Sequence, residues 1–248
     1  MSDGELTVVT LNALGIPRAG ARLAERYTAI GDRLDAGDAD VVCLQEVMTW
    51  WHLRLLARRM RSFRHVCYRR TPAGPGGGLV TFSRRPVSGF EYTRFGLPPR
   101  APGIARSTRY RNCMKGVLVS RLRQPGLSVV STHPLANWDG DWSPSNRFYP
   151  LHRAQLGALT AVLRGVPGQV VVCGDFNVDR DSSLMREFIT DTGLSDAFGG
   201  TCPPTFRAEY LPPGATPHCI DFILTSQDVK TTNAALLFAD KVPLPSGP

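Results

Sequence analysis

Residues 170–177 read VVVCGDFN. Four apolar residues come first, and a short run that is rich in β-branched side chains predicts a buried β-strand. Asp175 and Asn177 come directly after this run, so their polar side chains are expected where the strand leaves the core. The stretch therefore indicates a buried strand that carries a site at its end.

Short apolar runs of the same kind recur along the chain and alternate with helical segments. The runs expected to be strands are 6–11, 41–44, 79–83, 116–122, 127–132, 170–173, 219–225 and 234–238. Apolar residues at helical spacing predict helices over 22–36, 49–60 and 150–164. Their inward-facing residues are expected to be Leu23, Tyr27, Ile30 and Leu34, then Trp51, Leu55 and Leu56, then Leu151, Ala154, Leu159 and Val162. This alternation predicts an α/β protein.

Three consecutive glycines, Gly76 to Gly78, stand before the run 79–83. A dinucleotide-binding loop follows a strand and opens a helix, so these glycines predict a tight connection instead.

The length and composition favour one domain over residues 1–248. A chain of 248 residues with 42% hydrophobic side chains is large enough to bury one substantial core. The N-terminus shows no secretory leader, and no apolar stretch approaches the roughly 18 residues that span a bilayer, so a cytoplasmic location is expected. Six cysteines lack metal-type spacing, and Cys43 and Cys173 lie in apolar runs, so reduced core thiols are expected.

The charge of the chain is unevenly distributed. The net charge is +8, but positions 47–138 hold 17 Lys or Arg residues and one acid, Glu91. Such a basic segment attracts an anionic partner, which can be nucleic acid, a phospholipid head group or a phosphorylated metabolite. An arginine-rich surface that is merely solvated is the alternative.

Four of the apolar runs end in a polar residue of a catalytic type. Asn12 follows the first run, Gln45 and Glu46 follow the second, His133 follows the run 127–132, and Asp175 opens the polar end of the run 170–173. Neighbouring strands place their ends along a common edge, where a pocket can collect side chains that are far apart in sequence. We therefore expect these residues to share one site.

Their chemistry suits a divalent cation and a phosphate ester. Glu46 and Asp175 supply carboxylate oxygens, and Asn12 and Asn177 supply amide oxygens, which suits Mg²⁺ better than zinc. His133 and Lys115 could stabilise charge on the phosphorus, and Asp175 could deprotonate the attacking water. Taken singly, each has a plainer reading, as an exposed glutamate, a loop histidine or an Asx turn.

The same residues form an ordered set of motifs. The motifs are Thr10-Leu11-Asn12, Leu44-Gln45-Glu46-Val47, Gly77-Gly78-Leu79, Lys115-Gly116, Thr132-His133, Gly174-Asp175-Phe176-Asn177 and Ile220-Asp221-Phe222-Ile223. In this order, the set resembles the endonuclease/exonuclease/phosphatase superfamily. The resemblance implies a four-layer α/β sandwich of two mixed, mostly antiparallel sheets flanked by helices. It also implies hydrolysis of phosphate esters with Mg²⁺, or with Mn²⁺ as an alternative.

The resemblance also implies a role for each matching residue. Glu46 would be the principal metal ligand, with Asn12 as an auxiliary ligand. Asp175 and Asn177 would position the water and the phosphate, and His133 would stabilise the transition state. Lys115 and Asn137 would contact the substrate, and Asp221 would orient a general-base histidine.

That histidine is expected in a Ser-Asp-His motif after Asp221, and the five histidines of the chain, at 52, 65, 133, 152 and 218, all precede Asp221. The favoured interpretation is a fragment that lacks its C-terminal catalytic loop and last strand. The alternative is a divergent, catalytically impaired module that binds phosphate. His218 is a weaker candidate for the missing base.

Within the superfamily, the chain looks most like the neutral sphingomyelinase branch. This branch implies a phosphodiesterase that acts on a phospholipid head group, with peripheral membrane contact and no transmembrane segment. Aromatic residues after His133 could dip into a lipid interface or simply pack their loop; they are Trp138, Trp142, Phe148 and Tyr149. Nuclease activity is the main alternative, because arginines such as Arg106, Arg109 and Arg111 could follow a phosphate backbone.

Overall fold

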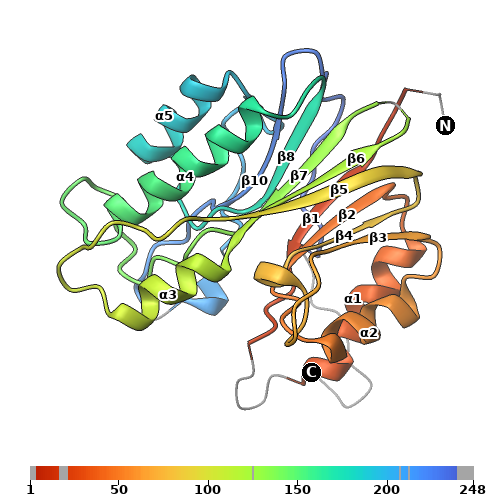
Figure 1. The fold of residues 1–248 in the computed structure, drawn as a ribbon, viewed down its shortest axis with the longest axis horizontal. Coiled ribbons are helices and arrows are strands. Elements are labelled where there is room, and N and C mark those ends of the chain that lie inside the picture. Colours follow the sequence, from red (N-terminus) through yellow and green to blue (C-terminus); the bar gives the residue numbers. More distant parts are fainter. Residues whose placement is uncertain (1–3, 17–21, 125, 207, 212, 239–248) are drawn as a thin grey trace.

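The chain folds into two β-sheets that pack face to face, with helices on the outer face of each sheet (Figure 1). The computed structural model describes residues 4–16, 22–124, 126–206, 208–211 and 213–238. Six of the eight strand pairs are antiparallel and two are parallel. The predicted four-layer α/β sandwich of mixed, mostly antiparallel sheets is confirmed.

The smaller sheet has four strands in the order β1-β2-β4-β3. Its strands are β1 (Val8–Asn12), β2 (Val41–Gln45), β3 (His65–Cys67) and β4 (Val80–Ser83), and only β1 and β2 run parallel. Two helices cover its outer face, α1 (Leu23–Ala36) and α2 (Trp50–Arg59). A short 3-10 turn, η1 (Gly76–Gly78), leads into β4, as the three glycines predicted.

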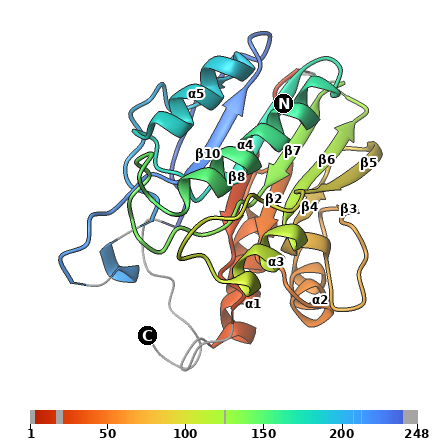
Figure 2. The ribbon, with the colours of Figure 1, turned by 60° about the vertical axis from the view of Figure 1, so that its left-hand side comes forward.

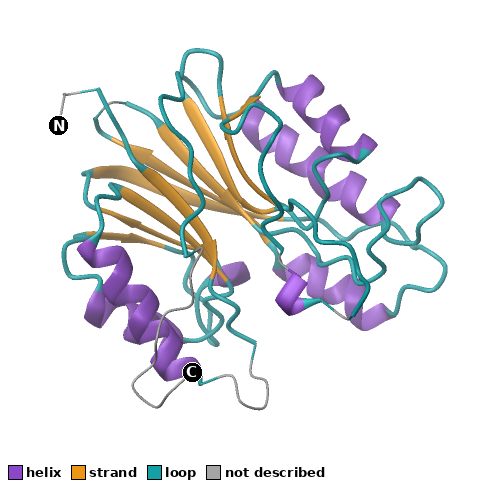
Figure 3. Cartoon of the chain, turned by 180° about the vertical axis from the view of Figure 1, so that it is seen from behind, coloured by secondary structure: helices purple, strands orange, loops and turns teal. Residues whose placement is uncertain are grey.

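The larger sheet has six strands in the order β5-β6-β7-β8-β10-β9. They are β5 (Val87–Arg94), β6 (Gly116–Leu122), β7 (Ser128–Thr132), β8 (Val170–Asp175), β9 (Ser195–Asp196) and β10 (Asp221–Thr225), with β7 and β8 parallel. Its outer face is covered by α4 (Tyr149–Arg164) and α5 (Ser183–Thr192), visible from behind in Figure 3. The remaining helices are α3 (Arg106–Met114) and η2 (Ala208–Tyr210).

Strand β2 explains why these apolar runs are continuous. Val41 and Cys43 pack between the sheets against Val171 and Cys173, whereas Leu44 points the other way, toward α1 and α2. Successive strand residues face opposite sides, so a strand buried on both sides needs an unbroken apolar run. Cys43 and Cys173 are buried free thiols, as expected.

Several elements differ from the sequence-based expectations. The expected strand over 234–238 is wrong: within the described part of the chain this segment is irregular, and Leu236 and Leu237 are 37% and 49% exposed. An apolar run forms a strand only where a neighbouring strand pairs with its backbone groups. The helices α3 and α5 and the strands β3, β5 and β9 were not expected, because polar residues such as those of α3 obscure the periodicity.

Two inward-facing residues were also assigned to the wrong side. Trp51 is 48% exposed, and Trp50 packs against the core in its place, because the inward stripe of α2 runs through Leu53 and Leu56. Ala154 is exposed on α4. No helix within the described ranges is both long enough and apolar enough to cross a bilayer.

Candidate functional site

The polar residues that follow the apolar runs meet at one edge of the sandwich because of strand direction. Parallel pairing of β1 with β2 sets Asn12 beside Gln45, and Glu46 follows. Parallel pairing of β7 with β8 sets Thr132 beside Gly174, so His133 and Asp175 leave the larger sheet together. Parallel strands end at the same edge, as the sequence predicted.

Two antiparallel strands add residues from their beginnings. Strand β10 starts where β8 ends, and Asp221 lies directly opposite Asp175. Strand β6 starts near the end of β7, so Lys115, the residue after α3, reaches the same edge. All predicted site residues except Asn137 therefore gather here.

Gly174 lets β7 and β8 approach at this edge. Its φ is +147°, and a Cβ atom at this position would lie 2.0 Å from the carbonyl oxygen of Thr132. Only glycine tolerates that conformation and that contact together. The GDFN sequence thus begins with the residue that allows Asp175 to stand next to His133.

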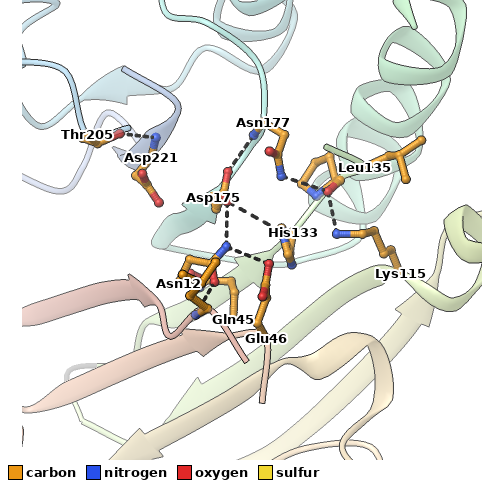
Figure 4. Close-up of polar contacts among 12 residues, drawn as sticks. Asn12, Gln45, Glu46, Lys115, His133, Leu135, Asp175, Asn177, Thr205 and Asp221 are labelled. Atoms are coloured by element: carbon orange, nitrogen blue, oxygen red, sulfur yellow. Dashed lines mark hydrogen bonds and ion pairs between the residues drawn. The ribbon is translucent and has the colours of Figure 1, made fainter. Parts of the chain in front are cut away.

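The centre of the site is a hydrogen-bonded cluster of Asn12, Glu46 and Asp175 (Figure 4). The Asn12 side-chain amide donates to Glu46 Oε1 at 3.2 Å and to Asp175 Oδ2 at 2.9 Å. Asn12 Oδ1 accepts from the backbone N–H of Leu14 at 2.9 Å, which fixes the orientation of the amide. One amide therefore joins a carboxylate from each sheet.

Glu46 and Asn177 both have left-handed backbones, with φ of +61° and +52°. Such conformations cost free energy for non-glycine residues and concentrate at functional sites, where the surroundings hold them. The Tyr27 hydroxyl donates to the Glu46 carbonyl at 2.9 Å, and Trp142 Nε1 donates to the Asn177 carbonyl at 2.9 Å. Asn177 N also donates to Asp175 Oδ1 at 2.9 Å, closing an Asx turn.

Cationic and amide donors lie beside the carboxylates. Lys115 Nζ and Asn177 Nδ2 both donate to the carbonyl oxygen of Pro134, at 2.8 and 3.2 Å. His133 Nε2 lies 3.6 Å from Asp175 Oδ2. These three side chains place nitrogen donors next to the carboxylates of the cluster.

Burial shifts the pKa values of the basic groups. Desolvation, followed by the charge of Lys115, holds the pKa of His133 well below its usual value. The imidazole is therefore neutral at neutral pH, and its contact with Asp175 is a dipolar one. Desolvation lowers the pKa of Lys115 to about 8, although Asp175 and Glu46 oppose the shift. Lys115 remains mainly cationic at neutral pH.

The two facing aspartates have raised pKa values. Desolvation raises the pKa of Asp175, while the bonds from Asn12 and the charge of Lys115 oppose this. Desolvation and the nearby charge of Asp175 raise the pKa of Asp221 to about 8, and the Thr205 hydroxyl lowers it. Adjacent buried carboxyl groups resist double ionisation. An added cation would favour the ionised forms of both.

The donor set fits a hard divalent cation. Glu46 is only 6% exposed, and its buried Oε2 atom has no hydrogen-bond partner. A buried anionic oxygen without a partner is costly, and a metal ion would satisfy it. The described residues contain no group of three His, Cys, Asp or Glu side chains suited to a metal ion. Carboxylate oxygens completed by waters are the pattern of Mg²⁺ rather than zinc. The Asn12 amide presents its NH₂ group to the two carboxylates, and its oxygen accepts from Leu14 N.

Asn137 makes its side-chain hydrogen bonds within its own loop. Its side chain donates to the Asp141 carbonyl at 2.8 Å and accepts from Asp139 N at 3.0 Å, so it closes its own loop. Of the four aromatics considered for a lipid interface, Trp138 is 70% exposed. Phe148 is buried, and Trp142 and Tyr149 pack against the core of the larger sheet.

Several contributing groups were missed by sequence reasoning. The carbonyl of Pro134 and the hydroxyl of Tyr27 act through the fold, and a main-chain carbonyl leaves no signal in residue type. His218, considered as a substitute base, bonds to Asp179 Oδ2 at 2.7 Å and stacks edge-on against Trp142. Asp179, two residues after Asn177 in the sequence, could have suggested this Asp–His pair.

Comparison with known proteins gives a consistent result. Residues 9–239 match the model of the Endonuclease/Exonuclease/phosphatase family. An inositol phosphosphingolipids phospholipase C from Schizosaccharomyces pombe is 28% identical over 209 residues, covering 80% of this chain and 47% of the relative. Human sphingomyelin phosphodiesterase 2 is 27% identical over 203 residues, covering 78% and 46%. The chain thus spans about half the length of the curated relatives it matches.

Solved structures share the fold at lower sequence identity. A mutant beta toxin from Staphylococcus aureus with bound magnesium ions has a TM-score of 0.69 at 15% identity, covering 91% of this chain and 85% of the toxin. TDP2 from D. rerio, complexed with a single-strand DNA product, has a TM-score of 0.61 at 18% identity, covering 90% and 84%. At these identities the likeness concerns the fold alone.

Proposed function

Because the chain belongs to the Endonuclease/Exonuclease/phosphatase family, we propose that it hydrolyses phosphoric diesters with Mg²⁺, or with Mn²⁺ as an alternative. The observation that carries the proposal is the cluster of half-buried Asn12 with buried Glu46 and Asp175, in which one oxygen, Glu46 Oε2, has no partner. The cluster is anionic, and donors for a phosphate stand beside it. That combination is the one that metal-assisted phosphate chemistry requires.

Glu46 would hold the cation through Oε2, and Asn12 would assist. The metal, when bound, neutralises charge on the phosphate and on the leaving oxygen. Asn12 meanwhile holds the two carboxylates at a fixed separation through its two donated bonds. The ligands are thereby arranged before the substrate arrives, which lowers the cost of reorganisation.

Asp175 would orient and deprotonate the attacking water. Its Oδ1 accepts the Asn177 N–H and its Oδ2 accepts the Asn12 amide, so the carboxylate cannot rotate. A bound cation would keep this carboxylate ionised, which is the form that can accept a proton from water. Asn177 Nδ2 lies close by and would bond a phosphoryl oxygen.

Lys115 and His133 would stabilise the negative charge that develops on the phosphoryl oxygens. Lys115 supplies a cation, and neutral His133 supplies an N–H donor. Both donors are fixed by the fold before reaction, which is the condition for strong electrostatic stabilisation. Asp221 borders the site on the β10 side and would orient a basic group there.

We assign a phospholipid head group as the favoured substrate. The two relatives described above carry the names of enzymes that act on phosphosphingolipids or sphingomyelin. The charge of the segment 47–138 and exposed Trp138 agree with contact at a lipid surface.

The test is hydrolysis of sphingomyelin, bis-p-nitrophenyl phosphate and plasmid DNA by the full reading frame, with Mg²⁺ and with EDTA. Glu46→Gln and Asp175→Asn are expected to lower the rate at least about 100-fold, as loss of central catalytic groups does. Glu187→Gln and Asp191→Asn remove the same groups from the exposed face of α5 and serve as matched controls. Hydrolysis that persists in EDTA would contradict the metal requirement.

Nuclease activity is the second candidate. The basic segment 47–138 suits a polyanion, and TDP2, which shares the fold, was solved with a DNA product. Cleavage of plasmid DNA without hydrolysis of sphingomyelin would favour it. Binding of inorganic phosphate without hydrolysis of any of the three substrates would favour a catalytically impaired binding module.

A further inference from the structure

The outward face of α3 combines apolar and basic side chains. Tyr110 and Met114, one turn apart, are 68% and 61% exposed. Arg106 lies one turn before Tyr110 on the same stripe, and Arg111 is exposed beside it. The opposite face of the helix holds buried Asn112, whose amide donates to the Gly96 carbonyl. We call Arg106, Tyr110, Arg111 and Met114 the α3 face.

Large apolar side chains are costly to expose, and their grouping on one stripe needs an explanation. Two further exposed apolar residues flank α3 in sequence or in space. Leu97, in the segment that leads into the helix, is 63% exposed, and Trp138, after β7, is 70% exposed. The segments that carry them are joined, because Arg147 donates to the Gly103 carbonyl at 3.1 Å and pairs with Asp139.

The α3 face adjoins the candidate site. Met114 ends the helix, and the next residue, Lys115, donates to the Pro134 carbonyl inside the site. Figure 2 shows α3 at the lower end of the strands, beside the loop that follows β7. Whatever the α3 face binds is therefore held next to the candidate site.

The charge around this face has one sign. Residues 92–138 contain eight Lys or Arg residues and no Asp or Glu. Arg109 is turned inward and donates to the Pro98 carbonyl, whereas Arg106 and Arg111 are exposed. An anionic surface would be attracted to this side of the molecule.

We propose that the α3 face docks the protein on a lipid bilayer that carries anionic head groups. Arg106 and Arg111 would contact the head groups, while Tyr110 and Met114 would enter the boundary with the acyl chains. A nucleic acid would use the arginines but gains little from an exposed methionine and leucine, because its backbone is bound by polar and basic groups. The apolar component therefore favours a lipid surface.

The proposal deepens the proposed function, because docking would place the site over phospholipid head groups. Docking itself needs no catalysis, so it can be measured separately. The test uses the full reading frame and sedimentation with vesicles of phosphatidylcholine alone, or of phosphatidylcholine with phosphatidylserine, in EDTA.

The wild-type protein is expected to sediment with the phosphatidylserine vesicles and to be released by salt. Arg106→Gln/Arg111→Gln should weaken binding roughly 30-fold, since each basic residue near such a surface contributes about 1 kcal/mol. Tyr110→Ser/Met114→Ser should weaken it about tenfold through the loss of buried apolar area.

Matched controls remove similar groups elsewhere. Phe90→Ser replaces an exposed aromatic residue on β5, and Arg54→Gln/Arg58→Gln removes two exposed arginines from α2. Both controls should bind vesicles as the wild type does. The proposal is overturned if the wild type does not bind anionic vesicles, or if the controls and the α3 variants lose binding equally. It is also overturned if duplex DNA binds and only the arginine pair matters.

Hydrolysis of bis-p-nitrophenyl phosphate, a soluble substrate, separates docking from catalysis. The α3 variants should keep the wild-type rate on this substrate and lose activity only on vesicles. Vesicle binding by a protein that hydrolyses nothing would end the proposed function and leave docking intact. Equal rates of vesicle hydrolysis by the wild type and all variants would overturn docking by the α3 face and leave the proposed function intact.

Discussion

At the scale of single residues, Glu46 combines a strained backbone with an unsatisfied side chain. Its φ is +61°, its carbonyl is held by Tyr27, and its Oε2 is buried without a partner. Each feature costs free energy in the isolated fold. A bound cation would recover the cost of the unpaired oxygen.

Mg²⁺ is therefore expected to stabilise the folded protein. At roughly 100 times its dissociation constant, a ligand of the native state adds about 2.7 kcal/mol to the free energy of unfolding. Thermal unfolding with MgCl₂ or EDTA should show a higher midpoint with Mg²⁺ in the wild type and in Glu187→Gln. Glu46→Gln should show little shift, and an unchanged shift in this variant would refute the ligand assignment.

His152 predicts a dependence of stability on pH. It is fully buried, Nε2 contacts the Leu135 carbonyl at 2.7 Å, and desolvation lowers its pKa to about 4. The folded state therefore favours the neutral ring. The neutral ring therefore contributes its full stability to the fold above about pH 6.5, the pKa of histidine in the unfolded chain. That contribution is lost as the pH falls toward about 4, the pKa of His152 in the folded protein.

When the pH falls from 7.5 to 5, the contribution of His152 to the free energy of unfolding should decrease by about 2 kcal/mol. The raised pKa of Asp221 changes the free energy of unfolding in the opposite direction over this range, so the contribution of His152 is the difference between the wild type and His152→Gln in urea unfolding at both pH values. Lowering the pH should be less unfavourable for His152→Gln than for the wild type. Buried His133 and His52, whose pKa values are also lowered, should leave a residual dependence in that variant. An equal loss in His152→Gln and the wild type would contradict the assignment.

At the scale of elements, β8 depends on a glycine at its closest contact with β7. Gly174→Ala would place a methyl group 2.0 Å from the Thr132 carbonyl oxygen and force a left-handed backbone. We expect a loss of about 3 kcal/mol or more in the free energy of unfolding. Gly157→Ala on α4, where a Cβ atom meets nothing within 4 Å, is the matched control. It should be neutral or mildly stabilising, as alanine is in helices.

A buried ion pair links the loop after β8 to β9. Arg180 pairs with Asp196, both side chains are less than a tenth exposed, and the guanidinium also lies 5.0 Å from the Phe222 ring. Asp196→Asn should cost about 3 kcal/mol, because it leaves Arg180 buried and uncompensated.

The control for this ion pair is Asp32→Asn, which breaks the exposed pair with Arg59. Pairs of this kind contribute less than about 1 kcal/mol. Denaturant unfolding compares the two variants, and equal costs would show that the Arg180 pair is not effectively buried.

At the scale of the whole molecule, the site lies where the two sheets meet. Asn12 and Glu46 come from the smaller sheet, and Asp175 comes from the larger one. The inner faces of both sheets share a core that includes Cys43 and Cys173. Neither sheet can unfold without exposing that core and separating Asn12 and Glu46 from Asp175.

Unfolding is therefore expected to be cooperative across both sheets. Far-UV circular dichroism and tryptophan fluorescence should give coincident midpoints in urea. Trp50 and Trp51 report on α2, and Trp142 reports on the larger sheet. A Trp138→Phe/Trp142→Phe variant restricts the signal to Trp50 and Trp51 on α2. A separate, earlier fluorescence transition in this variant would show that the smaller layer unfolds by itself.

The sequence alone determined the class of fold and most of the site. Unbroken apolar runs require strands buried on both faces, and polar residues at their ends mark the edge where chemistry can occur. These rules are local, and they identified Asn12, Glu46, His133 and Asp175 correctly as neighbours. They failed for the run 234–238, where an apolar pattern meets no partner strand among the described residues.

Only the tertiary structure decided how those residues are held and what surrounds them. The bridging amide of Asn12, the shared Pro134 carbonyl and the place of Asn137 outside the cluster depend on contacts between distant segments. The same holds for the α3 face, because polar residues conceal its helix in the sequence and exposure is a property of the folded chain. Strand ends are encoded locally, whereas distances, burial and pKa shifts arise only when the two sheets pack together.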